Sequence, residues 1–302
     1  MPSRMACVAI LSFWVYAAFG LFRRDILPDL IITPPPDMRS IAKAEASAGP
    51  TRWDIMVADD ANLRNLHSVG QAVTDSRRRD DGTIELTSDI RVDSARLLRG
   101  TPLASAHDEA VDISNSAEID QSGNLLSFRS TVRPAAGGLD LRKARDRDRE
   151  HDSENLITLD GRVNGKQLFV VCRSPYPVPL LNWNRPFPYE PRGMVENSVG
   201  PIDRMPGLQV GQRWESRVVS PLTGRVEIVT VEVAGKHAIH WGNSVITTLE
   251  VVHHLPPNLT ARTWVRPDGL VLRQEVPFPF VKLILERIPG PGDGTPTESK
   301  AP

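Results

Sequence analysis

Two pairs of histidines are the residues in this sequence whose type and spacing come nearest to metal chemistry. His237 and His240 are three residues apart, and His253 and His254 are adjacent. Side chains alternate between the two faces of a β-strand, so in strands each pair would point to opposite faces and could not chelate one ion. Zinc also needs three or four converging ligands, and no CxxC or HExxH motif supplies them. We therefore expect no bound metal, and we place His253 in the core beside Val251.

The paired carboxylates Asp59-Asp60 and Asp80-Asp81 are the other groups that could do chemistry. Both pairs lie in predicted turns, where aspartate usually accepts hydrogen bonds from the nearby backbone. Adjacent residues also rarely direct both carboxyl groups at one substrate. The sequence contains no Gly-x-Ser-x-Gly elbow and no glycine-rich phosphate loop. We therefore expect a protein that is not an enzyme and has no cofactor, with Cys172 as a small core residue.

Residues 174–207 form a segment rich in proline and aromatic residues but without periodicity. We expect a long ordered loop that wraps the sheet or covers its mouth. Its aromatic side chains are Tyr176, Trp183, Phe187 and Tyr189. We predict that these four residues bind a ligand by lining or closing an apolar opening. The alternative is that they only complete the core, since apolar side chains must cover any large open sheet.

The elements that would position these residues are β-strands, because apolar and polar residues alternate with period two. In residues 84–92 one face carries Ile84, Leu86, Ser88, Ile90 and Val92. Residues 111–119 alternate in the same way. Further strands are expected at residues 66–76, 125–133, 156–163, 167–173, 214–220, 226–234, 245–255, 261–266, 269–276 and 281–288, with a weak strand near 53–57.

Short turns that tolerate positive φ join many of these strands. They are Asp81-Gly82, Ser122-Gly123-Asn124, Asn164-Gly165, Gly242-Asn243 and Asp268-Gly269. Consecutive hairpins make an antiparallel meander, and about a dozen strands are more than an open twisted sheet holds without curling. The sequence therefore predicts a mostly β protein whose meander forms a curved half-barrel or a barrel.

The N-terminal region predicts a membrane anchor. Residues 5–22 carry no charge and would span roughly 27 Å as a helix at about 1.5 Å per residue. A cleaved signal peptide is the main alternative, although its apolar region is usually shorter. We expect a single-pass transmembrane helix within residues 1–24, an extended proline-containing linker over 25–52, the β-domain over 53–288 and a disordered tail over 289–302.

The charge of the chain limits its partners. Lys and Arg number 36 and Asp and Glu number 37, which gives a formal net charge of -1. This balance lacks the basic surplus of nucleic-acid-binding proteins, so we expect no nucleic-acid partner. Residues 139–154 mix both signs densely and leave nothing apolar to bury, so we expect a solvated loop or a short exposed helix there.

Two further stretches resemble a group of uncharacterised bacterial proteins. They are residues 206–214 (PGLQVGQRW) and 263–276 (TWVRPDGLVLRQEV), together with Trp53 and residues 80–83 (DDGT). The chain resembles signal-anchored exported proteins that are similar to lipoprotein-localisation-factor-like β half-barrels. The resemblance covers roughly residues 53–288. It implies an extracytoplasmic body and transfers no catalytic residues.

Together these features favour a membrane-tethered, periplasmic or otherwise extracytoplasmic β-domain without enzymatic activity. We expect it to bind an apolar, lipid-like ligand or an envelope protein. A structural accessory subunit of a membrane complex is the alternative, and a cell-envelope enzyme is a third.

Overall fold

The computed structural model describes residues 49–58, 66–97, 110–135, 155–177, 181–189, 200–220, 225–256, 258–278 and 281–290. The predicted anchor, most of the predicted linker and tail, the charged segment 139–154 and the Asp59-Asp60 pair lie outside these residues. Within the described ranges, no helix is long and apolar enough to cross a membrane.

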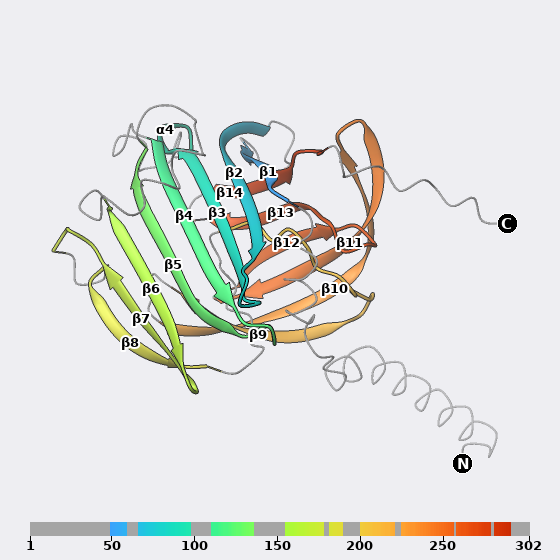
Figure 1. Ribbon diagram of the computed structural model, residues 1–302. Coiled ribbons are helices and arrows are strands. Elements are labelled where there is room, and N and C mark those ends of the chain that lie inside the picture. The colour runs from blue at the N-terminus through green and yellow to red at the C-terminus, as the bar shows by residue number, and fades with distance from the viewer. Residues whose placement is uncertain are drawn as a thin grey trace, which may run out of the picture.

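The described part of the chain is almost entirely β-structure (Figure 1). The first run of strands is β1 (Thr51–Ala58), β2 (Leu66–Arg78), β3 (Ile84–Asp93), β4 (Ala110–Ile119), β5 (Leu125–Pro134), β6 (Ile157–Asn164), β7 (Gln167–Arg173) and β8 (Trp183–Pro188). The second run is β9 (Arg213–Ser220), β10 (Arg225–Trp241), β11 (Ser244–Leu255), β12 (Leu259–Val265), β13 (Val271–Phe278) and β14 (Val281–Arg287). A single helical turn, α4 (Ser94–Leu97), follows β3. Every window predicted from alternation contains a strand.

All of these strands belong to one antiparallel sheet of 14 strands. The sheet runs from β8 back to β1, then through β14 back to β9, so the first and last strands pair with each other. Its two edges, β8 and β9, are consecutive in the chain and do not pair in the described structure. The predicted antiparallel meander is confirmed, and the sheet curls into an open, barrel-like shape (Figure 1).

Five tight turns gather at one end of the sheet. Their glycines have positive φ, a conformation that glycine adopts without a steric penalty: Gly82, Gly123, Gly165, Gly242 and Gly269. These are the turns predicted from the sequence. Because neighbouring strands alternate in direction, all five lie at the end where β1 begins and β14 finishes. The described chain therefore starts and finishes at this tight-turn end.

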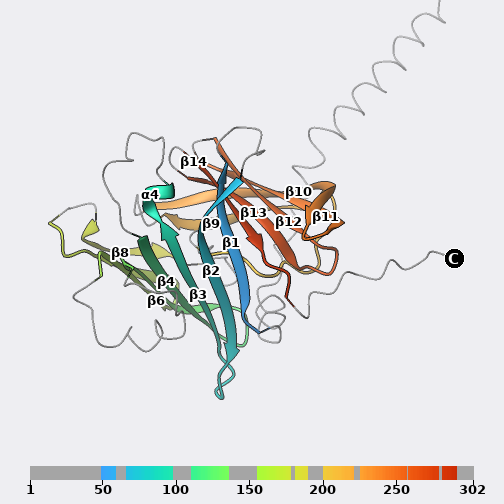
Figure 2. The same ribbon diagram turned by 90° about the horizontal axis from the view of Figure 1, so that it is seen from above.

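The main core lies between two limbs of the curled sheet, whose strands cross when viewed from above (Figure 2). The limb of β1–β3 contributes Trp53, Ile55, Val69, Ala72 and Ile90. The limb of β9–β11 contributes Trp214, Val229, Val231, Val233 and Val251. These residues are buried and form one cluster, so apolar burial holds the sheet in its curled form.

A β-bulge switches the buried face of β10. The register with β11 shifts between Val233 and Gly235. Before the shift Val233 faces the main core, whereas after it Ile239 and Trp241 belong to a second cluster. A bulge inserts an unpaired residue and so changes which side chains face each way. β10 therefore has buried apolar residues on both faces of the sheet, and it extends to Trp241, beyond the predicted end at residue 234.

The predicted loop over residues 174–207 requires a correction, because it contains β8. Trp183 and Phe187 alternate onto the inner face of this strand, but Pro186 and Pro188 interrupt the pattern. Proline is tolerated there because β8 lies at the edge of the sheet. The strand predicted near residues 53–57 is present as β1, which lies in the middle of the sheet between β2 and β14.

Candidate functional site

Three of the four predicted ligand-binding aromatics come together at β8. Trp183 and Phe187 make an edge-to-face contact, with ring centroids 6.2 Å apart and planes at 79°. Phe187 and Tyr189 are buried in a third apolar cluster with Leu168 and Val170, and Trp183 packs against this cluster while remaining half-buried. Trp183 is therefore the member of the trio with surface available to a ligand.

Tyr189 is held by hydrogen bonds at both its hydroxyl and its backbone. Its hydroxyl oxygen accepts a hydrogen bond of 2.8 Å from the backbone N–H of Leu125. Its own backbone N–H donates to the carbonyl oxygen of Lys166 at 2.9 Å. Burial raises the pKa of the phenol above its ordinary value, partly offset by the Leu125 hydrogen bond. The hydrogen bond to the Tyr189 hydroxyl thus connects the end of β8 to the start of β5.

Tyr176 lies apart from the other three aromatics and is 55% exposed. Its backbone N–H donates to the Ser174 hydroxyl oxygen at 3.3 Å, and its carbonyl oxygen accepts a hydrogen bond from Asn182 Nδ2 at 2.8 Å. The structure therefore does not bring Tyr176 into the cluster at β8.

The inner face of β5–β8 is apolar but only half-buried. The half-buried side chains that pack against the third cluster include Phe128, Leu159, Val163 and Trp183. The ring of Phe128 lies over Gly161, where an added Cβ would approach Phe128 Cε1 to 2.0 Å. The missing side chain at position 161 thus makes room for this aromatic ring on the inner face.

A row of small polar side chains crosses the inner face of β1–β5 beside this surface. Successive members oppose one another across neighbouring strands: Thr51, Thr74, Ser88, Asn115 and Ser130. Ser130 Oγ donates to Asn115 Oδ1 at 2.6 Å. Ser88 Oγ and Asn115 Nδ2 are buried and have no hydrogen-bond partner in the part of the chain that the structure describes. The inner face is therefore apolar with one polar band.

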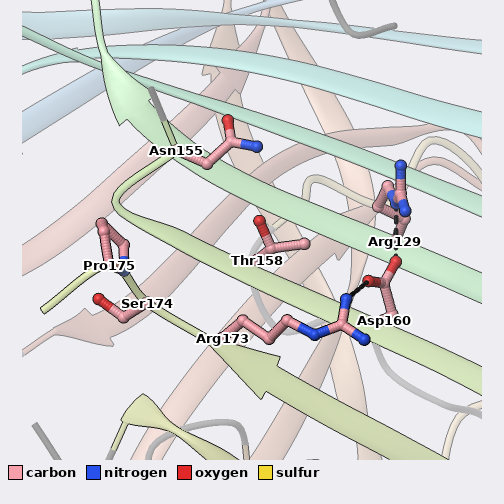
Figure 3. Close-up of a pocket in the computed structure, with 7 residues that line it drawn as sticks. All are labelled: Arg129, Asn155, Thr158, Asp160, Arg173, Ser174 and Pro175. Carbon is pink, nitrogen blue, oxygen red and sulfur yellow. Dashed lines mark hydrogen bonds and ion pairs between the residues drawn. The ribbon is translucent and has the colours of Figure 1, made fainter. Parts of the chain in front are cut away.

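A half-open pocket of about 260 Å³ lies on the opposite, outer face of β5–β7 (Figure 3). Its lining residues are Arg129, Asn155, Thr158, Asp160, Arg173, Ser174 and Pro175. Asp160 accepts from two arginines: Arg129 Nε lies 2.7 Å from Oδ1, and Arg173 Nη1 lies 3.4 Å from Oδ2. Two guanidinium groups therefore share one carboxylate.

Hydrogen bonds fix one side of this pocket. Ser174 Oγ donates to the Leu156 carbonyl oxygen at 2.8 Å, and the Ser174 backbone N–H donates to Asn182 Oδ1 at 3.0 Å. Sequence reasoning missed this pocket because Arg129, Asp160 and Arg173 come from three strands. Each residue is an ordinary polar residue on the wet face of its strand, and only the register joins them.

The residues that were considered for metal or acid–base chemistry are dispersed. His253 is buried, as predicted, and its Nε2 lies 3.4 Å from Thr263 Oγ1. Burial, and then the charge of His254, lower its pKa from 6.5 to about 4. Asp81 accepts from the backbone and hydroxyl of Thr83, in agreement with its predicted role in a turn. Among the described residues, no group of three or more His, Cys, Asp or Glu could hold a metal ion.

Cys172 is also buried, as predicted, on β7. Burial raises the pKa of its thiol, which disfavours the reactive thiolate. The position therefore fits a small core residue.

No family model matches this sequence, and no curated protein matches it. Two solved structures are similar to this chain in part. One is a beta-barrel-like protein of the domain of unknown function DUF1849 from Brucella abortus, with 10% identity and a TM-score of 0.46 over 79% of this chain and 94% of that one. The other is a DUF1089 family protein from Pseudomonas aeruginosa, with 13% identity and a TM-score of 0.32 over 67% of this chain and 87% of that one. At TM-scores below 0.5, neither protein informs the function of this chain. Neither is described as a lipoprotein-localisation protein.

Proposed function

We propose that the curled sheet binds an apolar, lipid-like ligand on the inner face of β5–β8. The observation that supports this proposal is the half-buried apolar surface formed by Phe128, Leu159, Val163 and Trp183. Covering apolar surface is favourable by about 25 cal/mol for each Å² removed from water. An apolar chain lying along this face would gain that free energy, whereas a polar ligand would gain none from these side chains.

Trp183 is the central contact in this proposal. It lies on an edge strand and packs edge-to-face on the buried ring of Phe187, which fixes its orientation. A large, rigid aromatic side chain offers much contact area with little loss of conformational entropy on binding. The buried residues Phe187 and Tyr189 support Trp183 and are not expected to touch the ligand themselves.

The proposal includes tethering by residues 5–22, with the body on the extracytoplasmic side of the membrane and a binding role in place of a catalytic one. An envelope protein could use the same inner face through an apolar segment. One feature bears on where such a tether would attach: β1, the strand nearest to residues 5–22 in the sequence, starts at the tight-turn end. The tether would then attach at the tight-turn end of the sheet.

Photo-crosslinking with a diazirine-bearing fatty acid tests the proposal on the full chain in a mild, uncharged detergent. We expect cross-links to peptides that cover residues 157–173 and 181–189. Cross-links confined to residues 5–22 would show that only the anchor meets apolar molecules, and the proposal would be abandoned. Mass spectrometry of co-purified lipid gives an independent readout. A stable protein partner without any bound lipid would support the structural accessory subunit.

Two aromatic variants distinguish specific binding at β8 from non-specific hydrophobic association. Trp183→Ala should reduce cross-linking of the body several-fold, because it removes the half-buried ring. Tyr176→Ala is the matched control, since it removes an aromatic ring that lies outside the cluster. Equal losses in the two variants would contradict a site at β8.

A further inference from the structure

The outer face of the sheet carries cross-strand ion pairs between arginine and aspartate. The number of arginines that contact one aspartate differs between these groups. On β3 and β4, two bonds of 2.7 Å join Arg91 to Asp112. A fork-to-carboxylate pair of this kind satisfies both partners. On β5–β7, by contrast, Asp160 is divided between Arg129 and Arg173. Two arginines thus contact one carboxylate in this second group.

The group of Arg129, Asp160 and Arg173 lies beside a pocket, which the Arg91 pair does not line. Arg173 contributes one nitrogen to Asp160 at the long distance of 3.4 Å, and its side chain is 67% exposed. In Figure 3 its guanidinium group lies at one side of the pocket, with Thr158 between it and Asn155. A guanidinium fork can bind a second oxyanion through its remaining N–H groups.

The size and chemistry of the pocket select a class of ligand. The pocket volume of about 260 Å³ is larger than a bare ion requires. Hydroxyl and amide groups of Thr158, Ser174 and Asn155 line the remainder. Tetrahedral oxyanions match this mixture of guanidinium and neutral polar groups.

We propose that this outer pocket binds a phosphate group, held chiefly by Arg173 with Arg129 as the second cation. The site lies on the face of the sheet opposite the apolar inner surface, so it is distinct from the ligand site proposed above. Asp160 has two opposing effects on phosphate binding in this pocket. Its carboxylate orients both arginines, and it also repels an incoming anion and competes with it for them.

Titration of the full chain with inorganic phosphate, followed by calorimetry in an uncharged detergent at low ionic strength, tests the proposal. Arg173→Gln should weaken binding by roughly tenfold, in keeping with a charge-assisted hydrogen bond. Asp160→Asn should tighten binding several-fold, because it removes the competing negative charge. Absence of phosphate binding by the unmodified protein, or weaker binding by Asp160→Asn, would overturn the proposal.

The pair of Arg91 and Asp112 supplies the matched control. Arg91→Gln removes a cation from the same face of the sheet without touching the pocket, so it should leave phosphate affinity unchanged. Equal losses in Arg91→Gln and Arg173→Gln would indicate only a general electrostatic attraction and would also overturn the proposal. Trp183→Ala should bind phosphate normally, which keeps this test independent of the apolar ligand site.

A second titration distinguishes two sources of the phosphate group. Short-chain, water-soluble dihexanoyl phosphatidic acid presents the group as a lipid headgroup. Tighter binding of this compound than of inorganic phosphate, with the same loss in Arg173→Gln, would assign the pocket to a phospholipid. Equal affinities with the same Arg173 dependence would assign it to a free phosphate or a soluble phosphate ester.

Discussion

Trp53 Nε1 donates a hydrogen bond of 3.1 Å to Asp203 Oδ1, which joins β1 to a segment 150 residues away. Asp203 also lies 3.6 Å from Arg287 Nη1 on β14. Its carbonyl oxygen accepts from the backbone N–H of Val271, and the neighbouring Ile202 N–H donates to Gln274 Oε1. The segment that precedes β9 is thereby attached to both runs of strands.

Loss of the Asp203 carboxylate should destabilise this junction. Asp203→Ala leaves the indole N–H of Trp53 and the buried charge of Arg287 without this acceptor, and we expect a cost of about 3 kcal/mol. Asp203→Asn keeps an acceptor for Trp53 and should cost less. The free energies of unfolding from urea titrations measure both effects, and equal values for the two variants would contradict this role of the side chain.

The Asp203 carboxyl should also contribute a pH dependence of a defined sign. Burial raises its pKa, although Thr74, Arg287 and Trp53 favour the ionised form. An acid with a raised pKa stabilises the fold fully below its ordinary pKa, and this contribution is lost as pH rises through the raised value. Asp203→Asn should remove this contribution to the pH dependence of stability. Urea titrations across the acidic range would detect the change as a different slope of the free energy of unfolding against pH.

His253 should make the protein less stable in mild acid. Its pKa is lowered from 6.5 to about 4, so the unfolded chain binds a proton between these values and the folded protein does not. Stability is therefore complete above pH 6.5 and falls as pH drops towards 4, by about 3 kcal/mol in total. His253→Gln should flatten this dependence, whereas His240→Gln, at an exposed position, should preserve it. The free energies of unfolding of the unmodified protein and both variants, measured at several pH values between 4 and 7, test this prediction.

Gly269 should not tolerate a side chain. Its φ is +88°, and an added Cβ would lie 2.7 Å from the backbone Cα of Pro206. Gly269→Ala combines a strained conformation with a backbone clash, so we expect a loss of about 3 kcal/mol. Gly235→Ala is the control, because nothing lies within 4 Å of its added Cβ. It should change the free energy of unfolding by less than about 1 kcal/mol. Similar losses at the two positions would contradict the tight approach at Gly269.

Phe187 and Trp183 should differ in their effects on stability. Phe187 is 6% exposed in the third cluster, so Phe187→Ala should cost about 3–4 kcal/mol through the cavity it leaves. Trp183 is half-buried, and Trp183→Ala should cost less, about 1–2 kcal/mol. Thermal or urea unfolding of both variants provides the comparison. A larger loss for Trp183 would show that its ring belongs to the core.

Local sequence information predicted the strands and hairpins well. Alternation in residues 84–92 placed Ile84, Ile90 and Val92 on one face, and the register confirms that they share the inner face. The turns at Gly82, Gly165 and Gly269 were predicted correctly because positive φ is a requirement of a few adjacent residues. The same reasoning missed β8, since the prolines permitted at a sheet edge conceal its alternation.

The candidate site was predicted only in part. The aromatic residues Trp183, Phe187 and Tyr189 do meet, but Tyr176 lies elsewhere, and composition could not separate them because it carries no strand register. The outer pocket between β5 and β7 gave no sequence signal at all. Arg129 and Asp160 become neighbours only when β5 pairs with β6 in one particular register.

The sequence by itself determined an antiparallel meander of alternating strands, because side-chain period and turn chemistry depend on residues close together in the chain. Tertiary structure alone decided that β1 pairs with β14, that the open edges are β8 and β9, and that Asp203 meets Trp53 and Arg287 inside the curled sheet. Those relationships join residues far apart in the chain. They depend on how the two limbs pack together, and no local pattern specifies that packing.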